Sequence, residues 1–124
     1  MNGLNEVQKD QLLDEVQNLW DNRSRFVTIT CVDLVDEFDL IYSFDHNMEL
    51  VNFRVKADKD RPFISISGIY AASFLVENEI QDQFGLKFEN LEPDFKGFLL
   101  LSQDGPRTPM LRKVGERGKQ EDVV

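Results

Sequence analysis

The sequence has few of the residues that bind metals or form disulfides. Its 124 residues include one cysteine, Cys31, and one histidine, His46. A single cysteine excludes a disulfide within the chain. One cysteine and one histidine also fall short of the ligand sets of a zinc site or an iron–sulfur cluster held by this chain alone. We therefore expect no cofactor and no metal in this chain.

Long apolar runs are absent as well. No stretch approaches the roughly 20 apolar residues that span a bilayer. Residues 1–6 have neither the basic region nor the apolar stretch of a secretory signal. We expect a soluble protein in a reducing, cytoplasmic compartment.

Positive charge is also scarce, with 14 Lys and Arg against 23 Asp and Glu, which gives a net charge of −9. This balance argues against a nucleic-acid partner, because binding to the phosphate backbone needs clustered basic residues. The composition is nevertheless that of a folded protein, since 41% of the residues are hydrophobic and ten are phenylalanine. The length suits one domain.

The charge is unevenly distributed along the chain. Residues 104–124 hold five basic and four acidic residues, so this segment carries +1 and residues 1–103 carry −10. The segment is rich in glycine and proline and has too little apolar surface to fold alone. We predict a single α+β domain over 1–103 and an extended C-terminal arm over 104–124. The arm is either a solvated tail or a segment that becomes ordered on a partner.

Hydrophobic periodicity predicts a helix, three strands and a second helix. Apolar residues recur at three- and four-residue steps over Leu4–Trp20, which is typical of an amphipathic helix. Three β-rich or alternating segments predict antiparallel strands, with a tight hairpin turn at 45–47. These segments are Arg25–Asp33, Phe38–Phe44 and Leu50–Lys56.

The second predicted helix begins near Ser67, a candidate N-cap, and ends at Phe84, just before Gly85. We expect a positive φ at this glycine. A stripe at helical spacing is expected to be buried, made of Ile69, Ala72, Val76, Ile80 and Phe84. A short strand is predicted at Phe98–Leu101. The predicted fold is an α+β two-layer sandwich in the order α-β-β-β-α-β, with a mixed, mostly antiparallel sheet packed against two helices.

Few side chains are candidates for chemistry. Glu79 and Asp82 are three residues apart on the second predicted helix and share a face, as an acid–base pair or a cation site would require. Exposed acids on a helix face are also common without any such role. We interpret His46 as a turn residue and Cys31 as a small buried residue of a strand.

The second predicted helix and its continuation resemble the signature of the NADH dehydrogenase 30 kDa subunit family of respiratory complex I. This family also occurs in membrane-bound energy-converting [NiFe] hydrogenases. Its pattern is Glu-Arg-Glu, any residue, an aromatic, Asp, any residue, Phe-Gly, an aliphatic, any residue, Phe. Asn78 stands here in place of the arginine and Gln81 in place of the aromatic. The matching residues are Glu77, Glu79, Asp82, Phe84, Gly85, Leu86 and Phe88.

Two further segments support the resemblance. The family's Pro-Leu-Arg-Lys element is similar to Pro109, Leu111, Arg112 and Lys113, with one extra residue after the proline. Ser65-Ile66-Ser67 looks like the Ser-Ile-Thr that precedes the motif helix. The resemblance spans roughly residues 4–114, and the short length looks most like the EchD-type hydrogenase branch.

The resemblance implies an accessory subunit, without a cofactor of its own, that packs on a hydrogenase-type large subunit beside an Fe–S small subunit. The [NiFe] centre and the Fe–S clusters would lie in those partners. The complex would be bound to the cytoplasmic side of the cell membrane through other subunits. Alternatives are the 30 kDa subunit of a complex I-type NADH/quinone or reduced-deazaflavin (F₄₂₀) oxidoreductase, a free-standing acidic binding module, and a small acid–base enzyme using Glu79 and Asp82.

We hypothesise that the motif residues form the partner interface. The three acids would form an acidic surface that pairs with basic groups of the large subunit. Phe84 and Phe88 would anchor the end of the helix around Gly85, and the basic arm would lie extended over the partner. The expected interface residues are Glu77, Glu79, Asp82, Phe84, Gly85, Phe88, Pro109, Leu111, Arg112 and Lys113.

Overall fold

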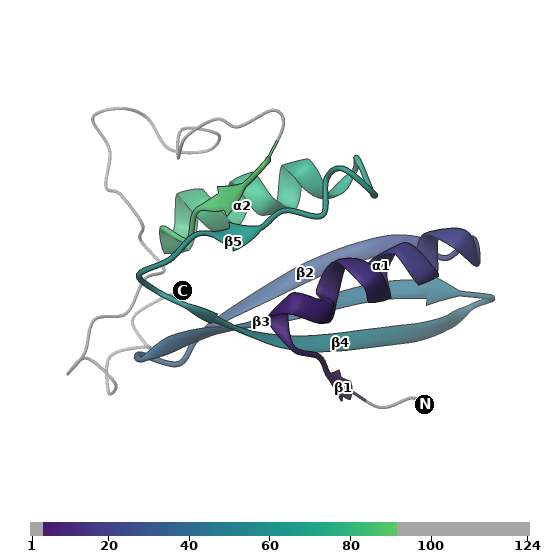
Figure 1. Cartoon of the computed structure of the whole chain (residues 1–124), viewed down its shortest axis with the longest axis horizontal. Helices are drawn as coiled ribbons and strands as arrows, with labels where there is room; N and C mark the ends of the chain where they lie inside the picture. Colours follow the sequence, from purple (N-terminus) through teal and green to yellow (C-terminus); the bar gives the residue numbers. More distant parts are fainter. Residues whose placement is uncertain (1–3, 92–124) are drawn as a thin grey trace.

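The computed structural model describes residues 4–91, which form a four-stranded sheet, two helices and a small second sheet (Figure 1). The sheet contains β1 (Leu4–Glu6), β2 (Arg25–Asp33), β3 (Glu37–His46) and β4 (Glu49–Asp58) in the order β1-β4-β3-β2. Strands β2, β3 and β4 are antiparallel, and β1 joins β4 in parallel. The fold is therefore α+β with a mixed, mostly antiparallel sheet, as predicted.

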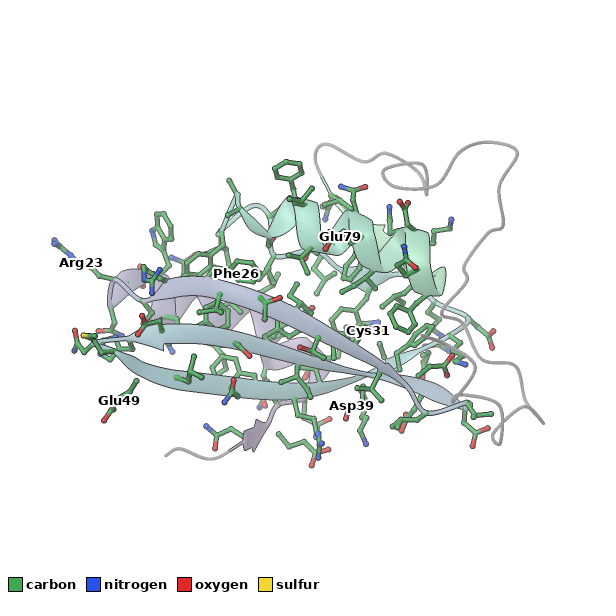
Figure 2. All side chains as sticks on the ribbon, turned by 180° about the vertical axis from the view of Figure 1, so that it is seen from behind. Arg23, Phe26, Cys31, Asp39, Glu49 and Glu79 are labelled. Carbon is green, nitrogen blue, oxygen red and sulfur yellow. The ribbon has the colours of Figure 1, made fainter. Side chains whose placement is uncertain are left out.

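The remaining elements pack on the apolar face of this sheet. They are a 3₁₀ turn, η1 (Lys9–Gln11), the helices α1 (Leu12–Asp21) and α2 (Ser73–Phe84), and the short parallel pair β5 (Phe63–Ile64) and β6 (Phe88–Glu89). Alternation along β3 places Phe38, Leu40, Tyr42 and Phe44 in the core. Leu12 and Val16 of α1 and Ile80 of α2 belong to the same core. Helix α2 runs alongside β2 in both views (Figures 1 and 2).

The N-terminal helix is shorter than predicted. Residues Leu4–Glu6 pair with β4 instead of beginning a helix, and α1 starts only at Leu12. The free edge of β4 offers these residues backbone hydrogen bonds along its length, which local periodicity does not reveal. Trp20, expected on the buried face, is 53% exposed and packs edge-on against Tyr70 with ring centroids 5.2 Å apart.

The second helix begins at Ser73, and its N-cap position lies five residues later than predicted. Ser67 does not cap it, because Ile66 first starts a turn in which its carbonyl accepts the N–H groups of Ile69 and Tyr70. Ala72 is the N-cap residue and makes no side-chain capping bond. Ile69 and Ala72 of the predicted stripe therefore precede the helix.

The hairpin between β3 and β4 turns at Asn47 and Met48, because both strands extend beyond the predicted boundaries. Both turn residues have positive φ, 52° and 70°, as a type I′ turn requires. The predicted strand Phe98–Leu101 and the C-terminal arm lie outside the described residues. The observed order is β-α-β-β-β-β-α-β, in which β1, β5 and β6 are short strands that the sequence did not predict.

Candidate functional site

The motif helix α2 buries polar residues where an ordinary amphipathic helix buries apolar ones. Ile80 is the one fully buried hydrophobic residue on it. A helix with such a face is held in place by its polar contacts as well as by apolar burial. Its buried polar residues are Ser73, Glu77, Asn78, Gln81 and Asp82.

Glu77 is the centre of a polar cluster that joins α2 to the segment after β5. Its carboxyl group is fully buried and accepts three hydrogen bonds. The Ser65 hydroxyl donates to Oε1 at 2.7 Å and the Ser73 hydroxyl at 3.3 Å. The Ile66 N–H donates to Oε2 at 2.9 Å. We call Glu77, Ser65, Ser73 and the Ile66 N–H the Glu77 cluster.

Burial raises the pKa of Glu77 to about 7, although the three hydrogen bonds from Ile66, Ser65 and Ser73 oppose the shift. The carboxyl group therefore changes protonation near neutral pH. The charge of Glu77 also affects Tyr42 of β3. Burial, and then the proximity of Glu77, raise the pKa of the Tyr42 hydroxyl well above its usual value. This hydroxyl has no hydrogen-bond partner among the described residues.

The two departures from the family pattern contact each other. Gln81 Nε2 donates to Asn78 Oδ1 at 3.4 Å, and Asn78 Nδ2 donates to the Phe74 carbonyl at 2.9 Å. Gln81 Oε1 accepts the N–H of Phe88 at 3.0 Å. Gln81 thus fastens α2 to the start of β6, and both amides lie in the domain interior.

The three motif acids do not form one acidic surface. Glu77 is 0% exposed and Asp82 is 1% exposed, whereas Glu79 is half-buried. Glu79 lines a cleft between α2 and β2 (Figure 2). The expected surface is incorrect for Glu77, because its carboxylate oxygens are occupied by donors of its own domain. With Asp82 buried and Glu79 in the cleft, the geometry does not favour an acid–base pair.

The end of the motif helix is built as predicted at Gly85. This glycine has φ 80° and ψ 5°, and its N–H donates to the Gln81 carbonyl at 3.0 Å. Phe84 packs edge-on against Phe38, with ring centroids 5.9 Å apart. Phe88 packs likewise on Phe63 at 6.4 Å. Both rings therefore pack within the domain. Four expected interface residues, Pro109, Leu111, Arg112 and Lys113, lie outside the described residues.

The lone histidine and cysteine do not form a nucleophilic site. His46 Nδ1 lies 3.0 Å from the Ser24 hydroxyl, a contact that sequence reasoning missed because the two residues are far apart in the chain. The other ring nitrogen faces the Asn47 amide at 3.3 Å, not the carboxylate that a triad needs. Burial, followed by the charges of Asp33 and Asp39, raises the pKa of Cys31 to about 12, which keeps its thiol protonated.

No helix within residues 4–91 combines the length and the apolar character of a membrane span. The same residues contain no group of three or more His, Cys, Asp or Glu side chains placed to hold a metal ion.

These features describe an α+β domain whose motif helix is fixed by an internal polar cluster. The sequence matches the profile of the family described as respiratory-chain NADH dehydrogenase, 30 kDa subunit, over residues 5–120. The chain therefore belongs to this family of subunits of complex I-related respiratory complexes. Sequence comparison with curated proteins finds no match.

The fold recurs in a solved structure. One similar chain comes from the membrane-bound sulfane sulfur reductase, an archaeal respiratory membrane complex. The two folds agree with a TM-score of 0.70 at 21% sequence identity, over 96% of this chain and 76% of the other. At this identity the likeness concerns the fold.

Proposed function

We propose that this chain is an accessory subunit of a membrane-bound energy-converting [NiFe] hydrogenase and carries no cofactor of its own. It packs on the large catalytic subunit and stabilises the peripheral electron-transfer arm on the cytoplasmic side of the membrane. The [NiFe] centre and the Fe–S clusters belong to the large and small subunits beside it. Contact with the membrane is indirect, through other subunits.

The observation that supports the role of a subunit in a complex I-related complex is the extent of the family match, which reaches from residue 5 to residue 120. It includes both the described domain and the basic segment with Arg112 and Lys113. The geometry also indicates that the acidic residues of the motif have different roles. Glu77 holds the domain together, while half-buried Glu79 is available at the domain surface.

The description of the family itself favours a second candidate, the 30 kDa subunit of a complex I-type NADH/quinone or reduced-deazaflavin oxidoreductase. The structural likeness to a sulfane sulfur reductase adds a further acceptor to be assayed. In all three cases the chain has the same structural role, and the reaction belongs to the partner subunits.

Purification of the tagged chain from host membranes in mild detergent tests the proposal. We expect a stable complex with a [NiFe]-type large subunit and an Fe–S small subunit, and hydrogen evolution or uptake by that complex. A complex that oxidises NADH or reduced deazaflavin without hydrogenase activity would support the second candidate instead. Recovery of the chain alone in the soluble fraction would overturn both and favour a free-standing acidic binding module.

A further inference from the structure

Strand β2 forms one edge of the main sheet and pairs only with β3 among the described residues. It is nine residues long, and its interior from Phe26 to Val32 has neither a charged residue nor a proline. An edge strand of this kind has a row of unpaired backbone N–H and C=O groups that readily accept another strand. Charged residues and prolines are the usual means of preventing such pairing, and the interior of β2 lacks both.

An open cleft of about 330 Å³ follows this edge. On the strand side it is lined by the four consecutive residues from Thr28 to Cys31. Successive residues of a strand point to opposite faces of the sheet. A cleft that contacts all four therefore runs along the edge of β2 rather than over one face. We call it the β2–α2 cleft.

Helix α2 forms the other wall of the β2–α2 cleft. Its lining residues recur with helical spacing and so make up a single stripe. Figure 2 shows Glu79 on this helix above β2, with Cys31 on the strand. Most of the stripe is apolar, and Glu79 is its charged member. The stripe consists of Val76, Glu79, Ile80, Gln83 and Phe84.

We propose that the β2–α2 cleft binds an extended segment of a partner subunit, which adds to the sheet as a strand beside β2. Backbone hydrogen bonds to the edge supply affinity, and alternate side chains of the added strand reach the helix wall. Those side chains are apolar opposite Ile80 and Phe84, and a lysine or arginine faces Glu79. A basic residue fits because the cleft has a carboxylate and the whole chain has a net charge of −9. This inference rests on the proposed function, which supplies the partner subunits.

A second copy of the chain is a poorer occupant. Antiparallel pairing of β2 with itself would bring Arg25 and Asp33 together across the axis. Both are already paired within the chain, Arg25 with Asp45 and Asp33 with Lys59, at 2.5 Å each.

Hydrogen exchange of the free full-length chain and of the purified complex tests the inference. We expect the amides of residues 28–32 to exchange at least about tenfold more slowly in the complex, with every second amide affected, since only alternate groups of an edge strand point outward. If the amides of residues 28–32 are as well protected in the free monomer as in the complex, the chain covers its own edge. Equal protection in a free dimer would mean that a second copy does. Either result overturns the inference.

A charge reversal provides the second measurement. Glu79→Lys should lower retention of the chain in the complex about tenfold, because it places like charges together in the cleft. The matched control is Glu15→Lys, an equal charge change at an exposed position of α1, which should leave retention unchanged. If a complex forms but residues 28–32 are unprotected and Glu79→Lys is retained, the inference fails and the proposed function stands. If no complex forms, both fail.

Discussion

Glu77 shows how one residue of a family motif can act entirely inside its own domain. Its carboxyl group accepts hydrogen bonds from two hydroxyls and one backbone N–H, and the side chain is fully buried. Burying a carboxylate is costly, and three donors reduce that cost without removing it. Protonation then becomes favourable near neutral pH, at a pKa of about 7 against a usual 4.5.

The raised pKa of Glu77 makes the stability of the domain depend on pH. The folded state holds the proton more tightly than the unfolded state. The contribution of this proton to the free energy of unfolding is therefore complete below pH 4.5 and is lost as the pH rises through 7. Glu77→Gln keeps the size and shape of the side chain but removes the charge that the folded state must bury. We expect this variant to lie within about 1 kcal/mol of wild type at pH 5 and to be up to about 3 kcal/mol more stable at pH 8. Urea unfolding at both pH values measures the difference.

Glu77→Ala is the informative comparison for that experiment. It removes the acceptor as well as the charge, which takes the acceptor from the buried Ile66 N–H and the Ser73 hydroxyl, while the Ser65 hydroxyl still contacts Ser67. We expect a loss of about 2–4 kcal/mol at pH 5. If Glu77→Gln loses as much stability as the alanine variant at pH 8, the ionised carboxylate stabilises the fold, and stability does not fall as Glu77 loses its proton.

Gly85 occupies a backbone conformation that other residues adopt only with strain. Its φ of 80° ends α2 and directs the chain toward β6. Gly85→Ala should destabilise the domain by about 1 kcal/mol, which urea unfolding detects. Gly68→Ala is the control, because its φ is not positive and a Cβ there would meet nothing within 4 Å. It should be neutral or slightly stabilising, so equal losses at the two glycines would count against the role of φ at Gly85.

At the scale of elements, the long strands and the ends of the two helices were predictable, and the starts of the helices were not. Arg25–Asp33 was predicted to the residue, because alternation and β-branched residues repeat over its full length. Helix α2 lacks an apolar stripe of that clarity, since its buried face contains Glu77, Asn78 and Gln81. A sequence pattern cannot distinguish these buried polar residues from solvent-exposed ones.

For a related reason, the sequence did not predict the two- and three-residue strands β1, β5 and β6. Each is defined by a partner distant in the chain, such as Phe63 opposite Phe88, and none is long enough to show a period. Gln81 illustrates the consequence. Its bond to the Phe88 N–H positions β6, yet in the sequence it was only a residue that departs from the family pattern.

The β3–β4 hairpin allows a stabilising change. Met48 is 93% exposed and has a φ of 70°, so its side chain makes few contacts and its backbone is strained. Met48→Gly completes the Asn-Gly sequence that type I′ turns prefer. We expect a gain of about 0.5–1 kcal/mol, seen as a higher melting temperature. Leu50→Gly, a neighbouring exposed strand position, should lower it. A lower melting temperature for Met48→Gly would exclude the type I′ assignment.

The whole molecule combines an acidic domain with a short basic segment. Family membership was predictable because the motif lies in one contiguous stretch from Glu77 to Phe88. The division of roles within the motif was not, since the sequence contains no sign that Glu77 is buried and that Glu79 borders a cleft. The proposed binding to partners therefore rests on two features, the cleft that only the folded chain reveals and the net positive charge of residues 104–124.

Arg112 and Lys113 test whether the basic segment contributes to assembly. Reversing both, with Arg112→Glu and Lys113→Glu in the full-length chain, should reduce its retention in the complex about tenfold, because attractive charges at the interface become repulsive. The control reverses two exposed charges of the domain, with Arg61→Glu and Lys87→Glu, and should be retained like wild type. Retention is measured after a fixed wash at low salt. Because salt screens such contacts, a wash near 1 M salt should bring wild type down toward the double variant. Equal retention of wild type and the Arg112/Lys113 variant at low salt would remove these residues from the interface.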